Sequence, residues 1–113
     1  MAVRALTNNA QVLLDEIKRQ IDVGKIKTWS YDKDGDFTHT PEQWKDEAWL
    51  KPQIKDDRLR LKIVKCQGKD LSREVFAVYH GRFIEMLVKH VPDLFTDARS
   101  TPKPDDDEPK VVD

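Results

Sequence analysis

The strict alternation of residues 58–63 constrains the fold of this chain more than any other feature. Three aliphatic residues alternate there with three basic ones. They are Leu59, Leu61 and Ile63 on one side and Arg58, Arg60 and Lys62 on the other. Successive side chains of a β-strand point to opposite faces, so this strand has one apolar and one basic face. Such a strand is typical of an antiparallel sheet whose core lies on one side only.

Other segments supply a helix and two hairpins. Residues 8–23 carry apolar side chains at helical spacing, with capping residues before them. Residues 25–40 alternate around Asp34-Gly35, a dipeptide that favours a tight turn. A second hairpin over residues 49–65 turns at Asp56-Asp57.

Residues 72–91 leave two alternatives open. They form either one long helix capped by Ser72, or a strand over 75–79 followed by a helix over 82–91. We favour the long helix, although Gly81 weakens its middle. Pro92 ends the helix in both cases.

With 113 residues, the chain has room for one core. We predict an α+β fold with an antiparallel sheet of about four strands and an N-terminal and a C-terminal helix on one face. This single domain spans residues 1–98. Residues 99–113 have no apolar periodicity and are acidic, so we expect a disordered acidic tail.

The compartment follows from what the sequence lacks. No apolar run has the length of a secretory signal or a membrane span, so no membrane is expected as a partner. Cys66 is the only cysteine, and an unpaired thiol fits a reducing compartment. We therefore expect a cytoplasmic protein.

Two stretches carry a resemblance to other proteins. Trp29 to His39 reads WSYDKDGDFTH, and Tyr79 to Leu87 reads YHGRFIEML. They resemble a family of small bacterial proteins of uncharacterised function, over roughly residues 10–95. The resemblance implies a bacterial, intracellular origin and brings no activity, cofactor or site residue with it.

The basic face of the alternating strand is the strongest functional feature. Residues 51–73 hold eight bases and three acids, and Arg58, Arg60 and Lys62 share one face. Such a stripe can follow a nucleic acid backbone or an acidic protein surface, but a solvated sheet face has the same pattern. No aromatic residue interleaves with the stripe, which weakens a single-stranded nucleic acid interpretation. We interpret the chain as a non-enzymatic binding or accessory module.

The alternative is a small enzyme or ligand-binding domain. His39, His80 and Arg82 would line its pocket, because arginine binds carboxylates and phosphates, and Gly81 permits close approach. Arg82 paired with Glu85 in an ordinary packed helix explains the same residues. No catalytic motif is present, so we lean away from an enzyme. The oligomeric state is not predicted.

Asp32, Asp34 and Asp36 alternate as the first ligands of a calcium loop do. The remaining positions fail, because Phe37 and Gln43 stand where that loop needs glycine and glutamate. We therefore interpret the segment as a turn, and predict neither a metal nor a cofactor.

Overall fold

The computed structural model describes residues 2–113. Within them, two helices and eight strands follow one another along the chain. They are β1 (Val3–Leu6), α1 (Ala10–Asp22), β2 (Trp29–Tyr31), β3 (Phe37–His39), β4 (Ala48–Ile54), β5 (Arg58–Lys65), β6 (Leu71–Ser72), α2 (Arg73–His90), β7 (Asp97–Arg99) and β8 (Val111–Val112).

The fold is α+β with an antiparallel sheet, which confirms the predicted class. The sheet has six strands in the order β2-β3-β4-β5-β1-β7, and β6 and β8 form a small parallel pair beside it. The prediction of about four strands missed β1 and β7, which lie before the first helix and after the second. These strands of four and three residues are too short to show a period of two without their partners.

Both predicted hairpins are present. The first turns through Asp34-Gly35, where Gly35 has a positive φ of 84° and donates its N–H to the Asp32 carbonyl at 2.9 Å. Glycine adopts this conformation at no steric cost. The second hairpin turns through Asp56-Asp57, closed by a 3.0 Å hydrogen bond from the Lys55 N–H to the Arg58 carbonyl.

Helix α2 settles the ambiguity over residues 72–91 in favour of one long helix. The Ser72 hydroxyl accepts a hydrogen bond from the Val75 N–H at 3.1 Å and so caps the helix. Gly81 lies in its middle with helical backbone and no close neighbour, so it serves no tight packing contact. The cap and the buried seam of α2 outweigh the weak helix propensity of one glycine.

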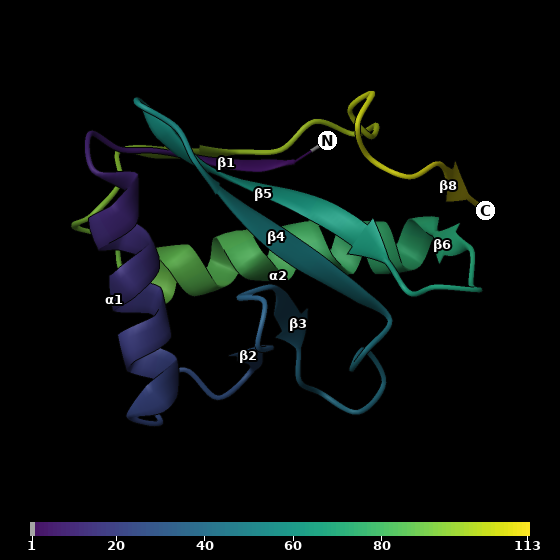
Figure 1. The fold of residues 1–113 in the computed structure, drawn as a ribbon, viewed down its shortest axis with the longest axis horizontal. Coiled ribbons are helices and arrows are strands. Elements are labelled where there is room, and N and C mark those ends of the chain that lie inside the picture. The colour runs from purple at the N-terminus through teal and green to yellow at the C-terminus, as the bar shows by residue number, and fades with distance from the viewer. Residues whose placement is uncertain (1) are drawn as a thin grey trace.

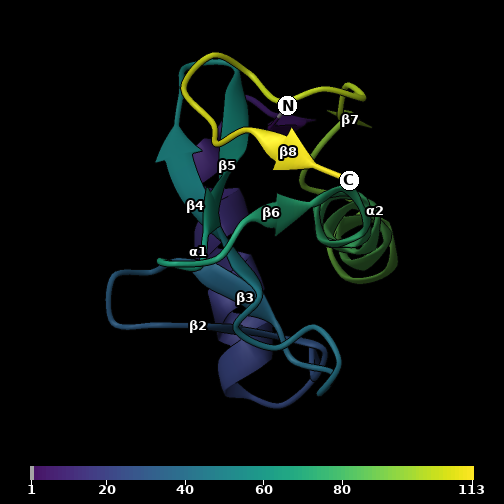
Figure 2. The ribbon, with the colours of Figure 1, turned by 90° about the vertical axis from the view of Figure 1, so that its right-hand side faces the viewer.

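The core lies between the helices and one face of the sheet. Figures 1 and 2 show α2 on one side of β4 and β5, with α1 running across its direction. Six side chains from the two helices and β5 are fully buried: Leu13, Ile17, Leu61, Ile63, Phe83 and Leu87. The helices and the sheet therefore share one hydrophobic cluster.

Residues 99–113 differ from the expected disordered tail. β7 pairs with β1, β8 pairs with β6, and Glu108 between them is buried. Figure 1 draws this segment in yellow, beside β1 and β5 at the upper right. The tail has few apolar residues to place it, so its position depends on polar contacts with the sheet.

We expect Leu61→Ala to lower the free energy of unfolding by about 2 to 5 kcal/mol, because a fully buried leucine leaves a cavity when truncated. Chemical denaturation measures this loss. Ile54→Ala at the exposed end of β4 is the control and should cost much less. Equal losses for the two variants would contradict the assigned faces of the sheet.

Candidate functional site

Four strands build a basic surface on the side of the sheet away from the core. Along β5 the aliphatic residues are buried, while Arg58, Arg60 and Lys62 alternate with them on the outer side. The register then adds basic residues from neighbouring strands. We call the resulting surface the basic face, and it consists of Arg4, Lys51, Arg58, Arg60, Lys62 and Arg99.

The basic face has two cross-strand rows. Arg4 on β1 lies opposite Arg60 on one side and Arg99 on the other, so three arginines form one row. Lys51 on β4 lies opposite Lys62 and forms the second row. Like charges directly opposite each other in a sheet are destabilising, so these rows favour any anion that comes between them.

The tail supplies such an anion. We call residues 105–108 the acidic turn. The Arg4 and Arg60 guanidinium groups each donate a hydrogen bond of 2.7 Å to the Asp105 carboxylate. Arg60 also donates to both oxygens of Asp107, at 2.8 and 3.0 Å, and the Lys62 ammonium lies 3.9 Å from the same carboxylate. One segment therefore neutralises members of both rows.

Glu108 fixes the acidic turn to the sheet backbone. Its Oε2 accepts a hydrogen bond from the Ile63 N–H, and its Oε1 accepts one from the Asp105 N–H, both at 2.9 Å. The second contact has the geometry of a capping box, which closes the turn on itself. Ile63 lies just beyond the part of β5 that pairs with β1, so Glu108 satisfies a donor that β1 does not reach.

These contacts perturb the titration of the paired groups. Burial opposes ionisation of Asp105, but the hydrogen bonds from Arg60 and Arg4 outweigh it and lower its pKa to about 2. The hydrogen bond from Arg60 also lowers the pKa of Asp107. The same bond to Asp107 raises the pKa of Arg60, whose side chain is only 12% exposed.

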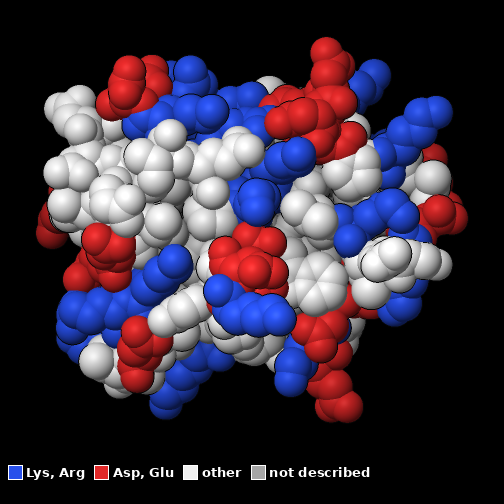
Figure 3. All heavy atoms as spheres, viewed as in Figure 1, with Lys and Arg blue, Asp and Glu red and all other residues white. Residues whose placement is uncertain are grey.

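The surface charge shows the same neutralisation. In the view of Figure 3, acidic groups adjoin basic ones throughout, including at the upper right where the tail lies. Of the basic face, the sequence identified Arg58, Arg60 and Lys62. It missed Arg4, Lys51 and Arg99, because only the strand register joins them to the stripe.

The structure places His39 inside the fold. Its Nδ1 lies 2.7 Å from the Thr28 carbonyl oxygen and so carries the proton of the neutral ring. The ring packs 4.6 Å from Trp29 and 6.1 Å from Tyr79, measured between ring centroids. Burial lowers the pKa of His39, so the residue is a neutral packing partner.

His80 and Arg82 lie along different hollows of the surface. The buried His80 ring contacts Phe76 and lines a hollow that the tail closes at Ser100. Arg82 is exposed, pairs with Glu85 at 3.3 Å and lines a neighbouring hollow. Neither hollow is lined by all three residues, although Arg82 is near enough to His39 for its charge to act on the pKa of that ring, after burial and the hydrogen bond to Thr28.

The three aspartates of the first hairpin form a turn. The Asp32 carboxylate accepts hydrogen bonds from the N–H groups of Asp34 and Asp36, at 2.9 and 3.0 Å. These bonds are typical of an Asx turn. In residues 2–113, no group of three or more histidine, cysteine, aspartate or glutamate side chains is arranged to hold a metal ion.

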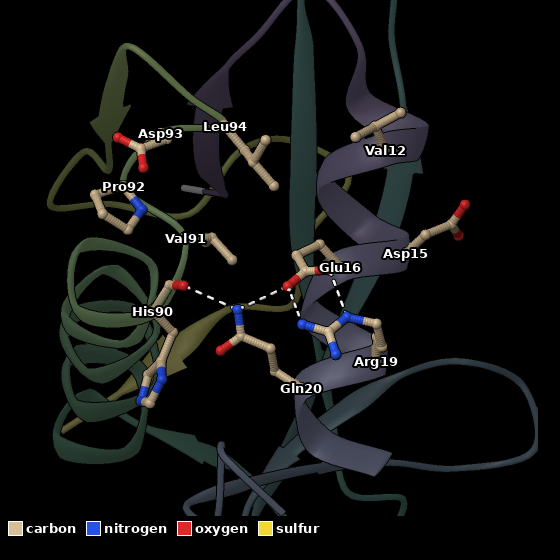
Figure 4. Close-up of a pocket in the computed structure, with 10 residues that line it drawn as sticks. All are labelled: Val12, Asp15, Glu16, Arg19, Gln20, His90, Val91, Pro92, Asp93 and Leu94. Carbon is tan, nitrogen blue, oxygen red and sulfur yellow. Dashed lines mark hydrogen bonds and ion pairs between the residues drawn. The ribbon is translucent and has the colours of Figure 1, made fainter. Parts of the chain in front are cut away.

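A groove lies between α1 and the end of α2, with a volume of about 540 Å³. Figure 4 shows its polar contacts, in which the Gln20 amide bridges the Glu16 carboxylate and the His90 carbonyl at 2.9 Å each. Hydrogen bonds from Arg19, then from Gln20, lower the pKa of Glu16 to about 2. Glu16, Arg19 and Gln20 thus bind one another, which leaves the groove weakly suited to a charged ligand.

Comparison with protein-family models, with curated proteins and with solved structures finds no match for this chain. Neither described helix has the length and apolar character required to cross a bilayer. Of the groove and the basic face, the basic face gathers more charge of one sign, and the acidic turn pairs with its Arg4, Arg60 and Lys62.

We expect acid to release the acidic turn. A carboxylate whose pKa is lowered in the folded protein stabilises its contacts above its ordinary pKa, here 3.8 for aspartate, and loses that stabilisation as the pH falls towards the lowered value. The amide resonances of residues 105–108 should therefore shift between pH 3.8 and about 2. NMR spectra recorded along a pH titration measure this shift.

The double variant Asp105→Asn and Asp107→Asn is the control for this titration. It removes both carboxylates while keeping the size of the side chains, so the transition should disappear. An unchanged transition in this variant, or none in the natural chain, would show that these ion pairs do not hold the turn.

Proposed function

We propose that the chain is a non-enzymatic binding module whose basic face binds a polyanion, either a nucleic acid or an acidic protein surface. The acidic turn occupies this face when the partner is absent. One observation carries the proposal, the pairing of Asp105 with Arg4 and Arg60 from two adjacent strands. It supports the proposal because two arginines of one row hold a carboxylate between them.

The competition between turn and partner is intramolecular. A segment tethered to the domain acts at a high effective concentration, of order millimolar for short flexible connections. Its carboxylates must leave before a partner can contact Arg60. The affinity of the natural chain for a partner is therefore lower than the affinity of the basic face without the acidic turn. A partner with more anionic groups displaces the turn more readily.

A salt titration of binding tests this proposal. The probes are a labelled single-stranded oligonucleotide, a DNA duplex and an oligo-aspartate peptide. The Asp105→Asn, Asp107→Asn variant should bind at least one of them more tightly than the natural chain, because it lacks the competing carboxylates. The affinity of this variant for its probe should fall steeply with salt, because salt screens the charges and, with a nucleic acid, binding releases counterions from the phosphates.

Two further substitutions in that double variant locate the site. Arg60→Gln should weaken binding and, with a nucleic acid, reduce the slope of log affinity against log salt by about 1. Arg82→Gln removes the same charge from the exposed surface of α2 and should leave both unchanged. Equal effects of the two substitutions, or no binding by any variant at low salt, would overturn the proposal.

A further inference from the structure

Trp49 lies on the same side of the sheet as the basic face. It is opposite Val64, which shares its side of β5 with Lys62 and Arg60. Its neighbours in β4, Ala48 and Leu50, are fully buried on the core side. Because side chains alternate along a strand, the Trp49 ring projects from the outer side.

The other two tryptophans pack in or against the hydrophobic core. Trp29 is buried and makes edge-on ring contacts with Tyr79 and Phe83. Trp44 is half-buried and packs against the hydrophobic cluster. Trp49 is half-buried as well, but it lies outside the cluster formed within residues 2–113. The fold thus leaves one large aromatic side chain on the basic face without a core role.

The spacing of this ring and the basic rows follows the strand. Trp49 and Val64 form one cross-strand pair, Lys51 and Lys62 the next, and Gln53 and Arg60 the one after. Each step of two residues advances about 6.8 Å along an antiparallel strand. An aromatic ring is therefore followed at regular intervals by basic groups, the combination by which proteins hold unpaired bases and their phosphates.

We infer that the ligand of the basic face is a single-stranded nucleic acid, with a base stacked on Trp49 and phosphates bound by the two basic rows. This inference rests on the proposed function. The acidic turn contacts Arg4, Arg60 and Lys62, so its carboxylates stand where the phosphates bind. Lys51 lies beside the ring and makes no salt bridge within the described part of the chain, although its charge acts on the nearby Asp36 carboxylate, whose pKa burial raises and Lys51 lowers.

The chemistry of the face distinguishes this ligand from the other polyanions. An acidic peptide is bound through the basic groups alone, as the acidic turn already shows, and gains no stacking from a tryptophan. In a duplex the faces of the bases are stacked on one another, so they do not reach a ring on a sheet surface. Only a single strand uses both the ring and the basic rows.

The test measures binding by the Asp105→Asn, Asp107→Asn variant with Trp49 intact, replaced by Phe, or replaced by Leu. The probes are oligo-dT, oligo-U, a duplex of matched length and oligo-aspartate. We expect Trp49→Leu to weaken binding of the single strands by roughly 5- to 150-fold, the range for loss of one base-stacking contact. Trp49→Phe should retain most of the affinity, because it keeps an aromatic face.

Tryptophan fluorescence gives a second readout that does not depend on the leucine variant folding. Single strands should quench the emission of the Trp49-containing protein, and the Trp49→Phe variant should lose that part of the quenching. The DNA and RNA probes show which backbone the face prefers. Binding of the duplex or the peptide as tightly as the single strands, with no effect of Trp49→Leu, would overturn this inference.

That outcome is distinct from failure of the proposed function. If the duplex or the peptide binds, and Arg60→Gln weakens that binding, the basic face is a polyanion site and only the single-stranded ligand is wrong. If no probe binds the double variant at low salt, both proposals fall.

Discussion

The register of β5 against β4 and β1 is the constraint on which the rest of the structure depends. It places Leu59, Leu61 and Ile63 beneath the helices, and in the same step it sets Arg60 opposite Arg4. A shift of one residue would exchange the two faces and bury three basic side chains without partners. The hydrophobic core therefore fixes the position of every basic group on the outer side.

That arrangement has an electrostatic cost, which the tail offsets. Three arginines from adjacent strands in one row repel one another across short distances. Asp105 lies between two of them, and the carboxylate of Asp107 bridges Arg60 towards Lys62. The resulting contacts hold a segment of low hydrophobicity against the sheet. They also explain why the outer side shows mixed charge in Figure 3 and no continuous basic surface.

The two helices pack on the inner side of the sheet, so neither of them covers the basic face. α2 covers the inner side with an aromatic seam, and the Tyr79 hydroxyl binds the Trp44 carbonyl and so ties the preceding loop to the helix. His39 packs against Tyr79, and His80 packs against Phe76, in the same region of the core. The sequence did not reveal this packing, because a histidine that lines a pocket and one that packs in a core have no different local pattern.

The sequence by itself determined the α+β class, the faces of β5 and both hairpin turns, because each depends on a local period or a turn residue. It left residues 72–91 open between one long helix and a strand followed by a helix, and only the packed structure decided for the long helix α2. It did not determine β1 and β7, which are stable only as neighbours of β5. It also could not place Arg4, Lys51 and Trp49 on one surface, since residues from β1, β4 and β5 meet only through register. The position of the acidic turn was likewise decided by tertiary structure, because its partners lie up to 101 positions away in the chain. Charge pairing over such separations leaves no periodic signal in the sequence.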